Sequence, residues 1–160
     1  MAESELLPPS VDPNAKLIGI RRITARNEAT ERTVVKVRGF EVVTDEPNAS
    51  NTGPTPLETV LAGLAGCEGV IISRCAAAMK FGYTALDMEC EGEVDQRGSR
   101  GVAGVRPYFN WVKIRIVVHS DESPERLEKL KKNVEFRCPV MNLLRSAGVE
   151  VTADWELAAA

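Results

Sequence analysis

The sequence predicts one α+β domain whose elements follow the order βββ–α–ββ–α–α–β. Three observations lead to this prediction. Alternating segments rich in β-branched residues lie early in the chain, a long run of small and apolar residues follows, and alternating and amphipathic segments share the rest. With 160 residues, 44% of them hydrophobic, the chain is long enough for one domain with its own core.

The first strands are expected before the long apolar run. Residues 17–23 are largely apolar and suggest a strand, and residues 32–38 alternate and are β-branched. Gly39 suits a turn, so residues 40–44 would return as a third strand. Residues 45–54 are rich in turn formers and lack periodicity, which predicts a loop.

A long helix is predicted from Pro56 to about Lys80. Thr55 and Glu58 have the spacing of a capping box around a proline at the first helical position, and Gly82 is expected to end the helix. Such a helix would be about 40 Å long. That length is too great for an incidental surface helix in a domain of this size.

One stripe of this helix consists of small residues spaced three or four apart: Ala62, Gly66, Gly69, Ser73 and Ala77. Glycines inside a helix cost roughly 1 kcal/mol each relative to alanine. A backbone packed closely against the stripe would offset this cost. The partner could be a second helix of this chain or the same helix of another subunit, and the length of the helix favours a homodimer.

The rest of the chain predicts two strands, two helices and a final strand. Strands are expected at 86–94 and 109–119, joined by a glycine- and arginine-rich connection. Ser123 and Pro124 start an amphipathic helix that reaches about Val134. Cys138 and Pro139 start a short helix that Gly148 ends, and the last strand covers 149–155.

Composition excludes several functional classes. The net charge of −3, with dispersed basic residues, does not favour nucleic acid or an anionic membrane. The acidic start of the chain lacks the pattern of a signal peptide, and we expect no stretch apolar enough to span a bilayer. A cytoplasmic protein is expected, with residues 1–15 as a mobile or loosely docked N-terminal arm and 16–160 as the single domain.

Metal binding is not expected. His119 is the one histidine, and it ends a predicted strand, which favours a structural role. The cysteines at 67, 75, 90 and 138 do not have the spacing of a zinc site. Cytosolic cysteines normally stay reduced, so four of them do not imply a disulfide framework.

Two of the four cysteines stand out as candidates for redox chemistry. Cys138 lies at a predicted helix start, where free N–H groups and the helix dipole favour a thiolate. Cys67 lies inside the long helix, so its thiolate would need a nearby cation or hydrogen-bond donor. Cys75 and Cys90 are expected to be buried core residues.

Three further residues are candidates for support of a reactive thiol. Glu58 could orient an arginine beside it, although its place in the capping box also explains it. Arg32 and Arg38 lie in the strands before the loop and are candidate cations. Solvation at the surface is the alternative for each arginine taken singly.

These motifs together resemble the OsmC/Ohr family, the osmotically inducible and organic hydroperoxide resistance proteins. The resemblance covers about residues 17–157. It rests on the order of the elements and on Asp45-Glu46-Pro47, Gly53-Pro54-Thr55-Pro56-Leu57-Glu58 leading to Ala65-Gly66-Cys67, and Cys138-Pro139-Val140.

The resemblance implies an intertwined homodimer with two long central helices between β-sheets. It also implies thiol-dependent reduction of organic or lipid hydroperoxides, with Cys67 as the attacking cysteine and Cys138 as the resolving one. No bound cofactor is implied, and an external dithiol of the lipoyl type would restore the thiols.

One departure from the family pattern concerns the residue ten positions before the reactive cysteine. The best-characterised peroxidases of the family carry an acidic residue there, whereas this chain has Leu57, with Glu58 nine positions before Cys67. The chain is therefore more similar to the OsmC-like branch. The alternative to a peroxidase is a weakly active or non-catalytic protein of this fold that acts in stress response, ligand binding or redox sensing.

Overall fold

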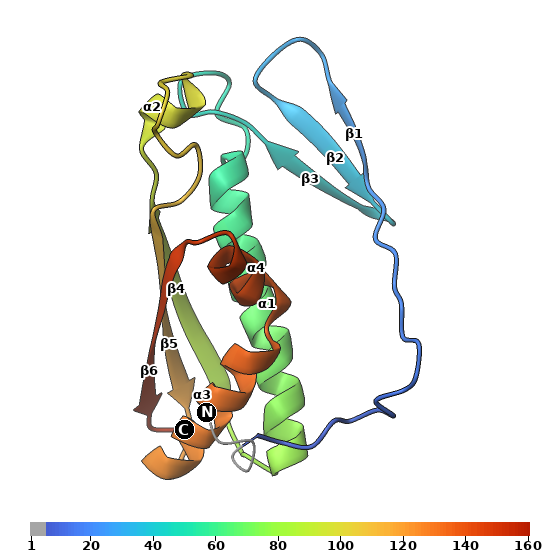
Figure 1. Ribbon diagram of the computed structural model, residues 1–160, viewed down its shortest axis with the longest axis vertical. Helices are drawn as coiled ribbons and strands as arrows, with labels where there is room; N and C mark the ends of the chain where they lie inside the picture. Colours follow the sequence, from blue (N-terminus) through green and yellow to red (C-terminus); the bar gives the residue numbers. More distant parts are fainter. Residues whose placement is uncertain (1–5) are drawn as a thin grey trace. The chain divides into compact units, whose positions relative to one another are not determined.

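The computed structural model describes residues 6–160, which form two compact units. One unit comprises Pro9–Val60. The other comprises Leu61–Ala160 together with residues 6–8. In the described residues the element order is β1, β2, β3, α1, β4, α2, β5, α3, α4, β6 (Figure 1). The predicted α+β class and order are confirmed, with the short helix α2 as an addition.

The smaller unit is an antiparallel sheet of three strands in the order β1-β2-β3. Its strands are β1 (Thr24–Asn27), β2 (Thr33–Val37) and β3 (Phe40–Thr44). The strand predicted at residues 17–23 is wrong, because the first strand begins only at Thr24. The apolar side chains of that segment have no buried surface to cover, and Ile18 is 85% exposed.

The long helix α1 (Pro56–Met79) begins and ends close to the predicted positions. The capping box is present: the Thr55 N–H donates to Glu58 Oε2 at 2.7 Å, and the Glu58 N–H donates to Thr55 Oγ1 at 3.2 Å. The predicted role of Gly82 is wrong, because the left-handed residue after the helix is Lys80, with φ 51°. The Phe81 N–H then bonds back to the Ala76 carbonyl at 2.9 Å, which closes a Schellman motif.

By length and composition alone, α1 could cross a membrane, contrary to the sequence-based expectation. Its most apolar window has a mean hydropathy of 1.5, because alanine, valine, leucine and isoleucine outweigh its few charged residues. Core helices of soluble proteins meet the same criterion. One face of α1 supplies Leu64, Ile72 and Cys75 to a hydrophobic core, although only 28% of the window is buried within this chain.

The larger unit contains a second sheet of three strands, β4-β5-β6. Its strands are β4 (Ala85–Glu93), β5 (Trp111–His119) and β6 (Glu150–Ala158), with α2 (Gln96–Ser99) between the first two. β4 and β5 are antiparallel, whereas β5 and β6 are parallel. A parallel pair needs a crossover connection, which α3 (Pro124–Arg137) and α4 (Pro139–Ser146) supply.

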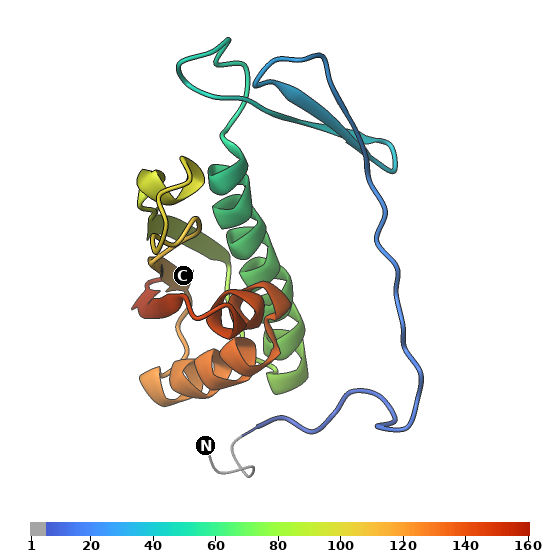
Figure 2. The ribbon, with the colours of Figure 1, turned by 45° about the horizontal axis from the view of Figure 1, so that its top comes forward.

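The core of the larger unit lies between this sheet and the helices. Every second residue of β5 is fully buried: Val112, Ile114, Ile116 and Val118. They join one cluster with the buried face of α1 and with residues of α3 and α4. In both views α4 lies beside α1 (Figures 1 and 2). This packing brings the start of α4 to the middle of α1.

Part of the predicted N-terminal arm is attached to the larger unit. Residues 1–5 lie outside the described residues, but the Leu7 N–H donates to Asn133 Oδ1 at 2.7 Å. The Leu7 carbonyl accepts from Arg137 Nη2 at 2.6 Å, and the Leu7 side chain packs against the core. This segment is therefore anchored to α3.

The backbone at Lys80 generates a stability prediction. A residue with a Cβ is strained at positive φ, whereas glycine is not. The Lys80→Gly variant should be more stable than Lys80→Ala by about 0.5–1 kcal/mol, since the alanine variant loses the same lysine but keeps the strain. Urea denaturation of the two variants measures the difference. Equal stabilities would contradict the assigned backbone conformation.

Candidate functional site

The two cysteines singled out in the sequence meet in the larger unit. Cys67 lies midway along α1, and Cys138 lies at the junction where α3 ends and α4 begins. The Cys67 side chain lies close enough to Cys138 to raise the pKa of its thiol. All four cysteines are free thiols. The thiol pair predicted from positions 71 residues apart is thus brought together by the packing of α4 beside α1.

Several backbone hydrogen bonds fix the position of Cys138. As the C-cap of α3 it donates its N–H to the Val134 carbonyl at 2.8 Å. As the N-cap of α4 its sulfur accepts from the Met141 N–H at 3.5 Å. Its carbonyl accepts from the Asn142 side chain at 2.8 Å. Cys138 is fully buried, whereas Cys67 is only partly buried.

The expected effect of the helix start on the Cys138 thiol is present, but burial outweighs it. Burial raises the pKa of the Cys138 thiol well above its ordinary value, and contacts with the Glu68 carboxyl and with Cys67 raise that pKa further. The N–H of Met141 acts in the opposite direction but does not compensate. Cys138 is therefore a protonated thiol at neutral pH.

Glu68 is a member of the site that the sequence analysis missed. Its side chain is fully buried, and neither carboxyl oxygen has a well-formed hydrogen bond. The Cys138 thiol lies close enough to Glu68 to lower the pKa of its carboxyl. Helical phase could have revealed it, because Glu68 lies four residues after Leu64 and four before Ile72, both fully buried.

Burial is the main cause that raises the pKa of the Glu68 carboxyl above its ordinary value. The contact with Cys138 lowers this pKa, Glu135 raises it and Arg145 lowers it. Glu135 of α3 and Arg145 of α4 form an ion pair with 2.8 Å between Oε2 and Nη2. The charges of Glu135 and Arg145 shift the pKa of Glu68 in opposite directions, so burial remains the dominant effect on that pKa.

Cys75 and Cys90 have the surroundings expected of core cysteines. Cys75 is 3% exposed and belongs to the core, and burial raises the pKa of its thiol. Cys90 on β4 packs against that core, and burial together with the charge of Glu68 raises its pKa to about 11. Neither thiol is activated for reaction.

The three predicted supporting residues lie in the smaller unit. Glu58 completes the capping box and is exposed to solvent. Arg38 lies over the ring of Phe40, 5.1 Å from its centroid. Arg32 donates from Nε to Thr52 Oγ1 at 3.0 Å. Each residue thus has a local structural contact of its own.

Arg32 belongs to a network that orders the loop after β3. Thr52 donates its N–H and its hydroxyl to Asp45 Oδ2, both at 2.9 Å, and Ser50 donates to the same oxygen. Asp45 is fully buried, and the hydrogen bond from Ser50 is the main cause that lowers its pKa well below the ordinary range. A charged Asp45 therefore holds the loop together.

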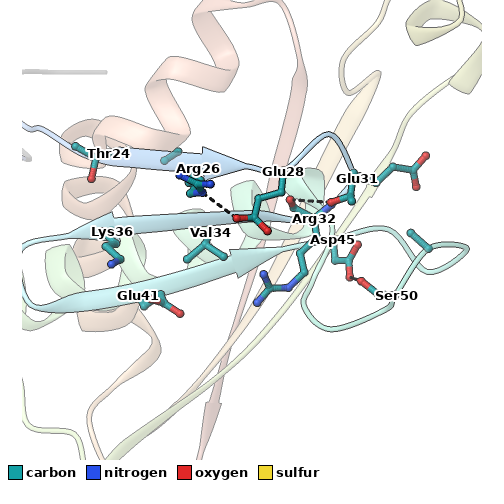
Figure 3. A pocket seen from close by; sticks show the side chains of 13 residues that line it. Thr24, Arg26, Glu28, Glu31, Arg32, Val34, Lys36, Glu41, Asp45 and Ser50 are labelled. Carbon is teal, nitrogen blue, oxygen red and sulfur yellow. Dashed lines mark hydrogen bonds and ion pairs between the residues drawn. The ribbon is translucent and has the colours of Figure 1, made fainter.

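A hollow of about 740 Å³ lies on one face of the smaller sheet (Figure 3). Its charged lining mixes both signs: Arg26, Arg32 and Lys36 with Glu28, Glu31, Glu41 and Asp45. Arg26 is paired with Glu28 at 2.9 Å. The mixture of charges gives the hollow no clear preference for an anion or a cation, and its lining contains no thiol.

Within residues 6–160, no three histidine, cysteine, aspartate or glutamate side chains are grouped to hold a metal ion. His119 forms a hydrogen bond from Nε2 to Asp87 Oδ2 at 2.7 Å. This contact is the main cause that raises the pKa of His119. The histidine thus has a partner across the β4–β5 pair.

Comparison with known families matches the thiol-bearing part of the chain. The profile of the OsmC family, described as OsmC-like protein, matches residues 49–154, which include both Cys67 and Cys138. The chain belongs to the OsmC family. Comparison with curated protein sequences gave no match.

Solved structures of OsmC-family proteins share this fold at low sequence identity. The OsmC-like protein from Mycoplasma pneumoniae is 22% identical, with a TM-score of 0.74 over 88% of this chain and 97% of that protein. OhrB of Bacillus subtilis, an organic hydroperoxide resistance protein, is 19% identical, with a TM-score of 0.60 over 88% and 98%. An organic hydroperoxide resistance protein from Elizabethkingia anophelis is 16% identical, with a TM-score of 0.70 over 90% and 100%.

The buried Glu68 of this OsmC-family chain generates a pH prediction. Because its pKa is raised on folding, burial of the neutral acid contributes stability that is complete below the ordinary pKa of 4.5 and is lost as the pH rises through the raised value. Glu68→Gln cannot ionise. Its free energy of unfolding should therefore increase relative to that of the wild type as the pH rises above 4.5.

Chemical denaturation across this pH range measures the effect. Glu91→Gln serves as the matched control, because Glu91 is an exposed carboxylate on β4. The control should follow the wild type at every pH. A constant difference between Glu68→Gln and the wild type would mean that Glu68 does not titrate on folding.

Proposed function

We propose that this OsmC-family protein is a thiol-dependent peroxidase that reduces organic or lipid hydroperoxides. The observation that carries the proposal is the contact between a partly exposed thiol, Cys67, and a fully buried thiol, Cys138. Two thiols in contact can be oxidised to a disulfide without a metal or a bound cofactor. The names of the OhrB and Elizabethkingia relatives agree with hydroperoxides as the substrate class.

The different exposure of the two cysteines supports different roles for them. Cys67 is the thiol that an incoming hydroperoxide can reach, whereas Cys138 is buried and protonated. The Cys67 thiolate attacks the outer peroxide oxygen and the O–O bond breaks. The alkoxide takes up the proton that Cys67 released on ionisation and leaves as the alcohol. Cys67 is then a sulfenic acid. Cys138 attacks its sulfur, water leaves, and a Cys67–Cys138 disulfide remains.

An external dithiol completes the cycle. One of its thiolates attacks the disulfide, its second thiol resolves the mixed disulfide, and both cysteines return to the reduced state. A lipoyl-type dithiol suits this exchange, because it closes a stable ring on oxidation. The proposed cycle operates in a reducing cytoplasm.

A redox-sensing or binding role is the alternative. Leu57 in place of the acidic residue of family peroxidases favours it, because Leu57 cannot accept a hydrogen bond from an activating arginine. In that case Cys67 would oxidise but would not turn over with a dithiol. Turnover in the presence of a dithiol therefore separates the two roles.

We also propose that the protein acts as a homodimer. The small-residue stripe of α1 supports this, because four of its five members are exposed in the single chain: Ala62, Gly66, Ser73 and Ala77. A Cβ added at Gly63 or Gly66 would meet no atom within 4 Å. These glycines are therefore not required by packing within the chain, and an approaching second helix explains them.

The proposed dimer predicts that a substitution on the small-residue stripe can weaken association without preventing folding. Gly66→Leu should fold, because the side chain has open space in the chain and leucine favours helix. It should nevertheless weaken dimerisation strongly, because the same side chain would meet the partner. Light scattering after size exclusion, with circular dichroism for folding, measures both.

Gly66 is a better site for this test than Gly69, where an added Cβ would lie 3.5 Å from the Met88 side chain of the same chain. A substitution at Gly69 could therefore disturb folding as well as association. A wild-type monomer at micromolar concentration, or a dimeric Gly66→Leu, would argue against the interface.

The proposed cycle predicts different defects for its two cysteines. With cumene hydroperoxide and dihydrolipoamide, Cys67→Ser should lose at least about 10³-fold in turnover, because the nucleophile is absent. Cys138→Ser should oxidise once and accumulate a sulfenic acid at Cys67, which a dimedone adduct reports by mass spectrometry. Cys90→Ala, the matched cysteine control, should turn over like the wild type.

The choice of peroxide tests the substrate class. Turnover of the wild type should be faster with cumene hydroperoxide than with hydrogen peroxide. If Cys67→Ser consumes peroxide like the wild type, the peroxidase assignment is wrong. If the wild type forms the disulfide but dihydrolipoamide does not reduce it, a redox-sensing role replaces the enzyme.

A further inference from the structure

Glu68 is a buried carboxyl group that interacts with the thiol of Cys138. It extends from α1 one residue after Cys67 and contacts Cys138 at the start of α4. Both of its oxygens are buried and lack a well-formed hydrogen bond. The Cys138 thiol interacts with the Glu68 carboxyl, and Cys138 in turn is influenced by Cys67. Carboxyl, resolving thiol and attacking thiol therefore form a continuous chain of contacts.

Packing alone does not explain a glutamate at this position. The neighbours of Glu68 in the buried stripe of α1 are Leu64 and Ile72, and an apolar residue would continue the stripe. A buried polar group without well-formed hydrogen bonds destabilises the folded chain, because it gives up its contacts with water. Such a cost is found at sites where the group performs chemistry.

We propose that Glu68 is the general base of the resolving step, which takes the proton from Cys138 as Cys138 attacks the oxidised Cys67. This inference rests on the proposed function and extends it to a third catalytic residue. Cys138 needs such a base, because its thiol is buried away from water and cannot give its proton to solvent. The contact between the thiol and the carboxyl supplies the acceptor.

The step conserves protons and electrons. The Cys138 S–H bond breaks as its proton passes to a Glu68 oxygen, and the electron pair left on Sγ forms the S–S bond to Cys67. The S–O bond of the sulfenic acid breaks, and its oxygen leaves as water after it receives a proton from the Glu68 carboxyl. Glu68 is thereby returned to the carboxylate, and no further reactant is needed.

The same contact keeps Cys138 from acting as the first nucleophile. While Glu68 is a carboxylate, a thiolate beside it would place two negative charges together in a buried site. At a pH above the raised pKa of Glu68, the pair therefore holds one proton, on sulfur, until Cys67 becomes electrophilic. Glu68 is coupled through pKa effects to groups on four elements, α1, β4, α3 and α4. These groups are Cys75, Cys90, Glu135, Cys138 and Arg145.

The test compares the wild type with Glu68→Gln, which keeps the shape of the side chain but cannot accept the proton. In a single turnover with cumene hydroperoxide, the Cys67 sulfenic acid should form at the wild-type rate. The following disulfide should form about 10²-fold more slowly, as expected for the loss of a general base. Dimedone trapping should then detect the sulfenic acid in Glu68→Gln but not in the wild type. Glu91→Gln is the matched exposed control and should behave like the wild type.

The pH profile separates catalysis from a structural role. The wild-type rate of disulfide formation should level off once Glu68 is a carboxylate. In Glu68→Gln the rate should rise about tenfold per pH unit, because hydroxide replaces the base. A slow variant whose pH profile matches that of the wild type would overturn the proposal.

A second assay does not depend on peroxidase activity. Ellman's reagent places a thionitrobenzoate on Cys67 in a Cys75→Ala/Cys90→Ala background, and attack by Cys138 then releases the coloured thiolate. Glu68→Gln should slow this release by a similar factor. If the wild type shows the release but reduces no hydroperoxide, the proposed function fails and the role of Glu68 stands. If Glu68→Gln releases the thiolate at the wild-type rate, the role of Glu68 is wrong.

Discussion

The packing of α4 beside the middle of α1 is the interaction on which the site depends. Cys138 is held by backbone hydrogen bonds as the C-cap of one helix and the N-cap of the next, so its thiol has little freedom. The core of the larger unit sets the distance between that junction and Cys67. A change that shifted α4 along α1 would separate the thiols before it unfolded the sheet.

Burial rather than the helix terminus determines the acidity of the Cys138 thiol. A helix start favours a nearby negative charge by about 0.3–1 kcal/mol at the surface and by up to about 2 kcal/mol in partly buried geometries. Full burial shifts the pKa of an ionisable group by up to several units, and each unit corresponds to about 1.4 kcal/mol. The neighbouring Glu68 adds to the effect of burial. Burial and the Glu68 carboxyl together therefore outweigh the helix start and keep the thiol protonated.

Two surfaces of the described structure are candidates for association. The small-residue stripe of α1 is one, and the face of the smaller sheet that carries Phe40, which is 63% exposed, is the other. Exposed apolar surfaces of this kind are typical of association sites. They accord with the proposed homodimer, which would bury what a single chain leaves in solvent.

The sequence by itself determined the order of the elements, the capping box at Thr55, the junction at Cys138 and the two cysteines of interest, because local hydrogen bonding and side-chain periodicity govern these features. It placed the first strand wrongly at residues 17–23, since apolar residues form a strand only where another strand pairs with them. Only the tertiary structure decided that Cys138 is protonated and that Glu68 contacts it. Burial and the meeting of α1 with α4 depend on residues far apart in the chain, so no local pattern encodes them.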